Sequence, residues 1–242
     1  MEIDRNSTVA KIATDHPNTL RIFEKYGIDY CCNGGQQLET ACKTAGVATN
    51  TILEEIQAVK QEPAADTVYL RFLPPSALID YIVQKHHEYT NLAMDEIDHL
   101  LEKIWLVHGG NHPELHTLKS LFQKEKGELT KHLKREELQV FPFIKYLEKA
   151  AAGTESVIPP RYGSFEEIWG DVTDEHEHTG KALESIRKLT NNFSPPADAC
   201  TSYTVTFKKL ETFVKDLHQH MHLENNVLHP MAKSLFQKVY PG

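Results

Sequence analysis

Residues 132–142 read HLKREELQVFP, and residues 220–230 read HMHLENNVLHP. Both stretches follow the pattern His-x3-Glu-x5-Pro, and their histidines lie 88 positions apart. Because an α-helix turns about 100° per residue, a histidine and a glutamate four positions apart share one helical face. Each stretch is therefore predicted to be helical and to present an imidazole and a carboxylate side by side.

A second pair of stretches repeats at nearly the same interval. Residues 87–97 read HEYTNLAMDEI and residues 176–186 read HEHTGKALESI, with an offset of 89 positions. His86 would give an offset of 90 and a poorer local match, so the repeat favours His87 over its neighbour. Two copies of a helical hairpin explain both intervals.

Long helices are predicted around all four stretches. We expect them at about 76–108, from Pro113 to about 151, from Ser164 to about 191, and from Pro196 to about 240. Ser164 with Glu167 forms a capping-box pattern. Four amphipathic helices with short or moderate connections, and no convincing strand, predict an all-α fold with an antiparallel four-helix bundle.

The first quarter of the chain has a different pattern. Residues 1–60 predict a small helical domain, residues 61–75 a linker rich in proline, and residues 76–242 the bundle. Ser7 is expected to cap a helix that ends at Gly27. The Cys31-Cys32 pair comes next, followed by the turn residues 33–35, Asn-Gly-Gly.

Composition and charge exclude several classes of protein. The 242-residue chain carries a formal charge of −8 and has no run of five basic residues, which argues against nucleic acid and anionic membranes as partners. No apolar run reaches the roughly 18 residues that a membrane span needs. The first residues, MEIDRNSTVA, do not resemble a secretory signal. We therefore expect a cytoplasmic protein with its four cysteines as free thiols.

The depth of each histidine in its helix gives a separate test of which ones meet. At about 1.5 Å per residue, His87 and His176 lie about 17 Å from one end of the bundle, and His132 and His220 lie about 28–33 Å from the opposite end. These depths place all four in one layer. In the last helix, periodicity alone does not separate His218 from His220, and the repeat favours His220.

Four imidazoles and two carboxylates in one buried layer require a cation, because buried acids are costly without compensation. Two metal ions bridged by Glu136 and Glu224 would supply it. Imidazole and carboxylate ligands suit iron, zinc or manganese, so the ligand types leave the metal open. The histidine-rich set favours a hemerythrin-type site over the Glu-x-x-His sites of ferritin-like proteins.

The other chemically notable residues receive plainer interpretations. We expect His86, His178, His218 and His222 to be solvated or to support the ligands. Cys31 and Cys32, next to an Asn-Gly-Gly turn, are expected to be exposed enough to react or to bind metal. Cys42 and Cys200 are expected to be structural.

Residues 24–35, EKYGIDYCCNGG, resemble the N-terminal signature of the repair-of-iron-centres family, di-iron proteins that repair iron–sulfur clusters. The two His-x3-Glu stretches resemble the hemerythrin-like helices of that family, and the resemblance covers nearly the whole chain. It implies two oxo- or hydroxo-bridged iron ions with bridging glutamates, held by His87, His132, Glu136, His176, His220 and Glu224. It also implies that Cys31 and Cys32 contact the damaged target or handle iron.

The resemblance further implies a cytoplasmic, often dimeric protein made under nitrosative or oxidative stress. Its partners would be damaged or apo iron–sulfur proteins, with nitric oxide or oxygen as small ligands. Our own expectation is that the di-iron centre supplies iron, with redox chemistry as the alternative, and that the protein does not act as a turnover enzyme. Oxygen-carrying hemerythrins place a second histidine four residues after the one on the third helix. Gly180 occupies that position here, so we expect open coordination space.

Three alternative functions are left open. A carrier or sensor of nitric oxide or oxygen would form a reversible adduct and would not need the cysteines. A nitric oxide reductase would turn over and release nitrous oxide. A zinc hydrolase would be colourless.

Overall fold

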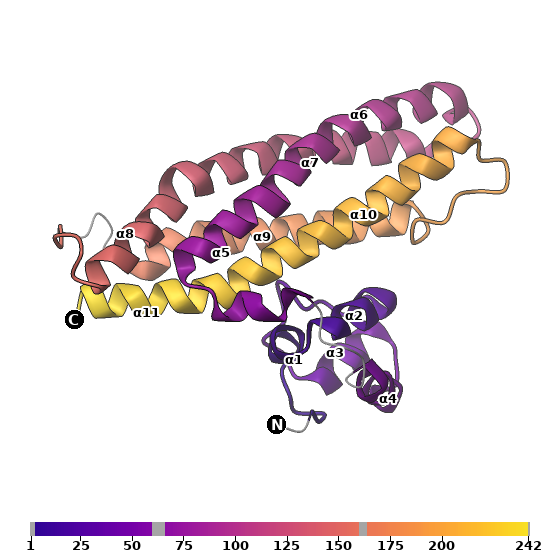
Figure 1. Cartoon of the computed structure of the whole chain (residues 1–242). Helices are drawn as coiled ribbons and strands as arrows, with labels where there is room; N and C mark the ends of the chain where they lie inside the picture. The colour runs from indigo at the N-terminus through magenta and orange to yellow at the C-terminus, as the bar shows by residue number, and fades with distance from the viewer. Residues whose placement is uncertain (1–2, 60–65, 160–163, 242) are drawn as a thin grey trace. The chain divides into compact units, whose positions relative to one another are not determined.

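The computed structural model describes residues 3–59, 66–159 and 164–241. The chain forms two compact units, one made of residues 1–79, 147–158 and 218–242 and the other of residues 80–146 and 159–217. Every regular element among the described residues is a helix (Figure 1), apart from an isolated bridge between Thr8 and Gln37. The predicted all-α class is confirmed.

The N-terminal part of the first unit consists of short helices. They are α1 (Val9–Asp15), the 3-10 turn η1 (Pro17–Thr19), α2 (Leu20–Tyr26), α3 (Leu38–Ala45) and α4 (Thr49–Val59). The single helix expected between Ser7 and Gly27 is broken at Pro17, whose ring removes a backbone donor. Ser7 donates its hydroxyl to Asp4 instead of capping α1, whereas Gly27 does end α2 with a φ of 65°.

The predicted linker is partly helical. Its residues 61–65 lie outside the described residues, and the 3-10 helix η2 (Asp66–Phe72) follows them. Leu70 of this helix is buried, and Arg71 pairs with Asp15 of α1. The ion pair and the backbone contacts between η2 and α1 connect this segment to the small helices. The domain boundaries at residues 60 and 76 stay predictions.

The long helices begin and end close to the predicted positions. In chain order they are α5 (Pro75–Ile82), η3 (Val83–His87), α6 (Glu88–His108), α7 (Glu114–Arg135), η4 (Glu136–Val140), α8 (Phe141–Ala151), α9 (Phe165–Leu189), α10 (Thr201–Leu223), η5 (Glu224–Leu228) and α11 (His229–Val239). Ser164 caps α9, because its hydroxyl accepts the N–H of Glu167 at 3.2 Å. Helices α5, α8 and α10 each contribute residues to both compact units.

Three of these segments, η3, η4 and η5, are single π-helical turns inside longer helices. The N–H groups of Phe141 and His229 close the latter two on the carbonyls of Glu136 and Glu224, five residues back. Pro142 and Pro230 lack an N–H, so each leaves a carbonyl four residues earlier without its α-helical donor. Such turns are frequent at functional sites. Each of the three contains one predicted metal ligand.

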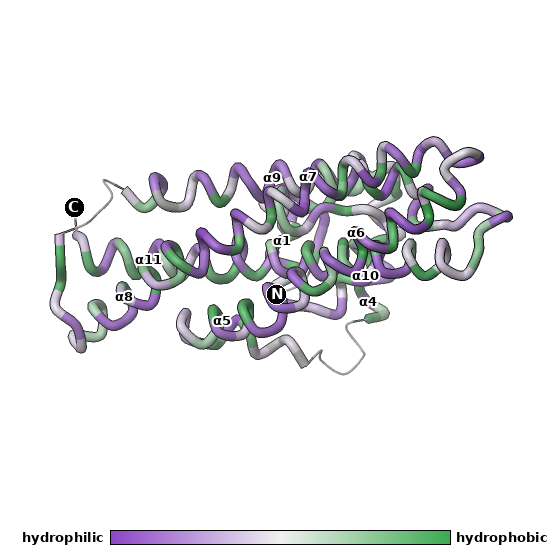
Figure 2. Tube along the Cα trace, turned by 90° about the horizontal axis from the view of Figure 1, so that it is seen from above, coloured by the Kyte–Doolittle hydropathy of each residue, from purple (hydrophilic) through white to green (hydrophobic). Residues whose placement is uncertain are grey.

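The core of the second unit lies between α6, α7, α9 and the first part of α10. Helix α7 packs against both α6 and α9, and Phe122 of α7 lies 5.6 Å from Phe213 of α10 between ring centroids. Green and purple segments alternate along the long helices in Figure 2, as amphipathic helices require. Burying each large apolar side chain stabilises the fold by about 1.5–3 kcal/mol. None of the described helices is both long and apolar enough to cross a membrane.

Candidate metal centre

Four of the predicted ligands gather in the second unit. His87 ends η3, His132 lies on α7, Glu136 begins η4, and His176 lies in the middle of α9. Glu136 Oε2 lies 3.5 Å from His87 Nε2 and 3.4 Å from His132 Nε2, and its Oε1 lies 4.0 Å from His176 Nε2. The three rings therefore direct their Nε2 atoms at one carboxylate.

The other two predicted ligands lie in the first unit, one turn apart. His220 is on α10 and Glu224 begins η5, and the His220 Nε2 to Glu224 Oε1 distance is 3.0 Å. Both side chains are at most 1% exposed. The His-x3-Glu spacing thus produces the side-by-side pair that helical geometry predicts.

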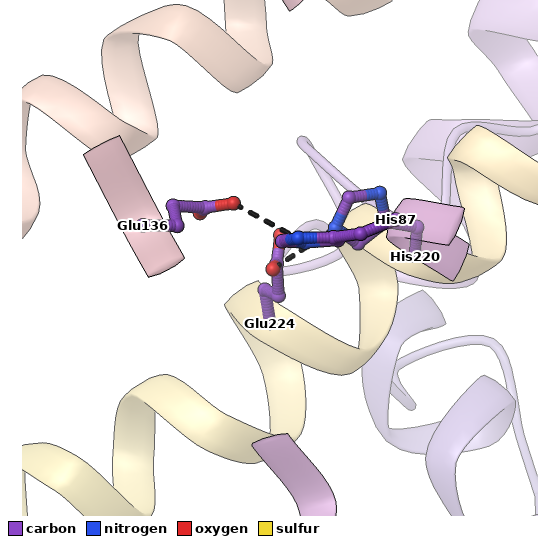
Figure 3. A group of neighbouring side chains, drawn as sticks. All are labelled: His87, Glu136, His220 and Glu224. Atoms are coloured by element: carbon purple, nitrogen blue, oxygen red, sulfur yellow. Dashed lines mark ion pairs between the residues drawn. The ribbon is translucent and has the colours of Figure 1, made fainter. Parts of the chain in front are cut away.

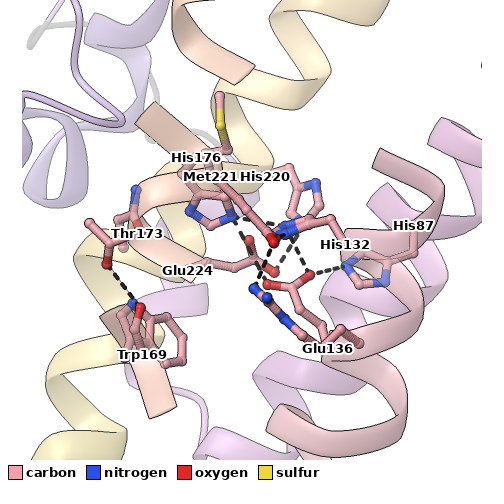
Figure 4. A network of polar contacts seen from close by, with 12 residues as sticks. His87, His132, Glu136, Trp169, Thr173, His176, His220, Met221 and Glu224 are labelled. Carbon is pink, nitrogen blue, oxygen red and sulfur yellow. Dashed lines mark hydrogen bonds and ion pairs between the residues drawn. The ribbon is translucent and has the colours of Figure 1, made fainter. Parts of the chain in front are cut away.

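Two groups of buried side chains have candidate ligand atoms within 4.8 Å of one another. His87, Glu136, His220 and Glu224 form one group, with its ion pairs drawn in Figure 3, and His132, Glu136, His176 and Glu224 form the other. Figure 4 shows all six side chains together. Both glutamates belong to both groups.

The chemistry of these donors fits a transition metal. Neutral imidazole and carboxylate are ligands for iron, manganese and zinc, and a divalent cation would compensate two fully buried carboxylates. The nearby hydroxyl of Thr173 already donates to the carbonyl of Trp169 on its own helix at 3.2 Å (Figure 4). The six histidines and glutamates of the two groups are therefore the candidate metal ligands.

Two further carboxylates contact the Nδ1 atoms of candidate ligand histidines, and the sequence interpretation missed both. Glu137 Oε1 lies 2.8 Å from His87 Nδ1, and Glu175 Oε2 lies 2.6 Å from His132 Nδ1. His132 and burial act in opposite directions on Glu175, and His132 prevails, so the pKa of Glu175 lies below its usual value. Such outer carboxylates hold the ring orientation of ligand histidines. Glu137 directly follows Glu136, and Glu175 directly precedes His176. This adjacency in the sequence could have identified both carboxylates.

Replacing Glu175 is expected to weaken metal binding while leaving all six ligands in place. In Glu175→Gln the affinity for iron(II) should fall by about 10–100-fold, as for other outer partners of metal ligands. Competition with a colorimetric iron chelator measures this. Glu177→Gln is the control, because Glu177 is an exposed acid of the same helix that pairs with Lys181. Equal affinity in the two variants would remove Glu175 from the centre.

The four histidines expected to be solvated or supporting differ among themselves. His178 is exposed, as expected. His86 is buried instead and faces Asp216, with 3.1 Å between Nδ1 and Oδ2. His218 pairs with Glu24 at 2.7 Å, and His222 is buried beside the Tyr30 carbonyl. Neither His86 nor His218, the rivals of His87 and His220, belongs to the two metal groups.

The cysteine pair forms a separate group with Asp29. The Cys31 and Cys32 sulfurs lie 3.5 Å apart, and Asp29 Oδ1 lies 3.4 Å from Cys31 Sγ. Contrary to expectation, Cys31 is buried, while Cys32 is half-buried. The neighbouring Cys32, burial and Asp29 together raise the pKa of Cys31 well above its usual value. Cys31, Cys32 and Asp29 meet the distance criterion for a metal site of their own.

The remaining two thiols, Cys42 and Cys200, also differ in their exposure to solvent. Cys42 is buried, but Cys200 is exposed, and its sulfur lies 3.1 Å from His108 Nε2. The N–H of Tyr203 and the His108 ring lower the pKa of Cys200. The thiolate is the form that reacts with alkylating agents.

Iodoacetamide is therefore expected to modify Cys200 before Cys31 at neutral pH. A lowered pKa keeps Cys200 partly ionised, and its reaction should slow only when the pH falls through that pKa. Cys31, with a raised pKa, should need alkaline pH. Mass spectrometry of peptides after timed alkylation between pH 6 and 10 measures both profiles. Faster modification of Cys31 at pH 7 would contradict the prediction.

Comparisons with known proteins match both parts of the chain. Residues 5–60 match ScdA_N, a domain of unknown function (DUF542), and residues 78–232 match the hemerythrin HHE cation binding domain. A Staphylococcus haemolyticus protein named iron-sulfur cluster repair protein ScdA is 31% identical over 226 residues, which cover 93% of this chain and 97% of that protein.

Proteins named iron-sulfur cluster repair protein YtfE are similar over the same extent. The Musicola paradisiaca and Escherichia coli proteins are each 29% identical over 229 residues, which cover 94% of this chain and 96% or 97% of the relative. The matches run through both the cysteine turn and the histidine-bearing helices. This chain thus belongs to the family of iron–sulfur cluster repair proteins that join an ScdA_N domain to a hemerythrin HHE cation binding domain.

Proposed function

We propose that this protein holds two iron ions in the bundle and restores damaged iron–sulfur clusters by supplying iron. The observation that carries the proposal is the pair of buried His/Glu groups that share Glu136 and Glu224. His87 and His220 would hold one ion, and His132 and His176 the other. The names of the relatives support the repair of clusters as the purpose of this site.

In this proposal the surrounding residues keep the site ready for metal. Glu137 and Glu175 hold the Nδ1 sides of two ligand rings, so that Nε2 is directed at Glu136. Bound iron would supply the ions that a damaged cluster has lost. It could also exchange electrons with the cluster. Gly180 offers no ligand at the position where oxygen carriers have a histidine, which favours release over saturated storage.

Cys31 and Cys32 are the proposed residues for contact with a target protein or for handling iron in transit. Thiolates bind iron in iron–sulfur proteins, so a thiol pair beside a carboxylate suits an ion moving towards a cluster. Both are free thiols, which a reducing compartment maintains, and we propose the cytoplasm as the place of action. The proposed partners are damaged or apo iron–sulfur proteins.

Metal content and repair test the proposal together. The purified protein should contain about two irons per chain, and iron-loaded protein should restore the cluster of a nitric oxide-treated iron–sulfur protein faster than an equal amount of free iron(II). Restoration no faster than with free iron would reject iron supply. A reversible nitric oxide adduct without repair would favour a sensor, nitrous oxide production a reductase, and bound zinc a hydrolase.

A further inference from the structure

Residues 29–35 form the Cys31–Cys32 turn, and the side chain of its first residue, Asp29, accepts hydrogen bonds from the backbone N–H groups that follow. The Asp29 carboxylate accepts the backbone N–H groups of Cys31 at 3.0 Å and of Cys32 at 2.9 Å. It also accepts the side-chain amide of Asn33 at 2.9 Å. An aspartate that binds the N–H groups following it stabilises a tight turn. Asp29 therefore satisfies the N–H groups of both cysteines within the turn. The carbonyl groups of Tyr30 and Cys31 are bound by residues from elsewhere in the chain.

The carbonyl side of the turn is held by two consecutive asparagines of η5. The Asn225 amide donates to the Cys31 carbonyl at 3.2 Å. The Asn226 amide donates to the Tyr30 carbonyl at 3.2 Å and to the Cys31 carbonyl at 3.3 Å. These contacts fix the backbone on which both thiols are mounted. The positions of the two sulfurs therefore depend in part on where η5 presents its amides, together with His222, which lies 3.3 Å from the Tyr30 carbonyl.

The same π turn begins at the predicted metal ligand Glu224. The His229 N–H closes the turn on the Glu224 carbonyl, so Glu224, Asn225 and Asn226 belong to one short hydrogen-bonded segment. A cation that binds the Glu224 carboxylate would fix the start of that segment. Without a cation, the full burial of this carboxylate is unfavourable, and η5 is the segment that would relax.

The small helices also contact α10 through residues that do not belong to η5. His218 Nδ1 lies 2.7 Å from Glu24, and the Tyr30 hydroxyl donates to the same carboxylate at 2.9 Å. Cys32 Sγ lies 4.0 Å from the Met221 sulfur. Removing the two asparagine amides would leave these contacts, so the loss of the amides should loosen the turn without unfolding the chain.

We propose that Asn225 and Asn226 are positioning residues that transmit metal occupancy at Glu224 to the Cys31–Cys32 turn. Metal loading fixes η5, η5 holds the two carbonyls, and the thiols become ordered and less reactive towards added reagents. Release of the metal frees the turn, so that the thiols become available when iron has left. The inference rests on the proposed metal centre but not on cluster repair.

Thiol reactivity in the full-length protein tests this coupling. In a Cys200→Ser background, N-ethylmaleimide modification of Cys31 and Cys32 is timed by mass spectrometry with bound iron(II) and after its chelation, without oxygen. We expect chelation to accelerate modification about tenfold. In Asn225→Ala/Asn226→Ala the metal should still bind, and the rate should be fast and equal in both states. Hydrogen exchange of residues 29–34 should follow the same pattern.

Gln219→Ala is the matched control, because it removes an exposed amide beside His220 and should keep the tenfold difference. Asn225→Asp/Asn226→Asp, which keeps the side-chain shape but not the donors, should behave as the alanine pair does. If the parent protein binds iron but its cysteines are modified at the same rate with and without the metal, the proposed coupling is wrong, whereas the metal centre is not contradicted. A metal-dependent rate retained in both double variants would also overturn it. Absence of bound metal in the parent would reject the centre itself.

Discussion

Glu224→Ala should lose iron and repair activity together, and Glu136→Ala should do the same. Each glutamate lies in both groups of candidate ligands, so one substitution removes a donor from both proposed ions. The loss of affinity should exceed the ~10–100-fold that removal of an outer partner causes. Iron per chain after gel filtration, together with cluster restoration, measures the effect.

Glu125→Gln is the matched control for these two variants. Like the two shared glutamates, Glu125 is buried, but it lies on α7 and belongs to neither metal group. Burial raises its pKa, so the neutral amide is an acceptable replacement for it. We expect this variant to keep its iron. Two irons and full repair in Glu224→Ala would show that this residue does not bridge.

Iron(II) should raise the melting temperature of the metal-free protein. A ligand that binds only the folded state stabilises it by about 3–4 kcal/mol when present at 100–1,000 times its Kd. For a chain of this size, each kcal/mol corresponds to roughly 2–4 °C, so we expect a rise of about 6–16 °C. Anaerobic differential scanning fluorimetry measures the shift, and a chelator should reverse it.

The double variant Glu136→Ala/Glu224→Ala provides the comparison for this experiment. It lacks both shared carboxylates, so added iron should change its melting temperature by no more than buffer alone. An equal iron-induced rise in both proteins would place the stabilising metal elsewhere.

Much of the fold and the ligand set follows from local sequence patterns. The His-x3-Glu spacing places His220 beside Glu224 within one helix, because helical geometry acts over four residues. Gly27 ends its helix through a left-handed conformation that glycine adopts readily. The prolines at positions 142 and 230 remove backbone donors wherever the helix lies. These outcomes need no information about distant parts of the chain.

Contacts between residues far apart in the sequence were decided only by the tertiary structure. The repeat favours His87 over His86, but packing alone directs His86 at Asp216, 130 residues away. The hydrogen bond from the Asn225 amide to the Cys31 carbonyl likewise joins residues 194 positions apart. The burial of Cys31 is also a result of packing. Periodicity reports which face a residue occupies, whereas the partner it meets depends on how whole helices pack. The sequence by itself determined the helices and the candidate ligands, and the packing determined which side chains contact those candidates and the cysteine turn.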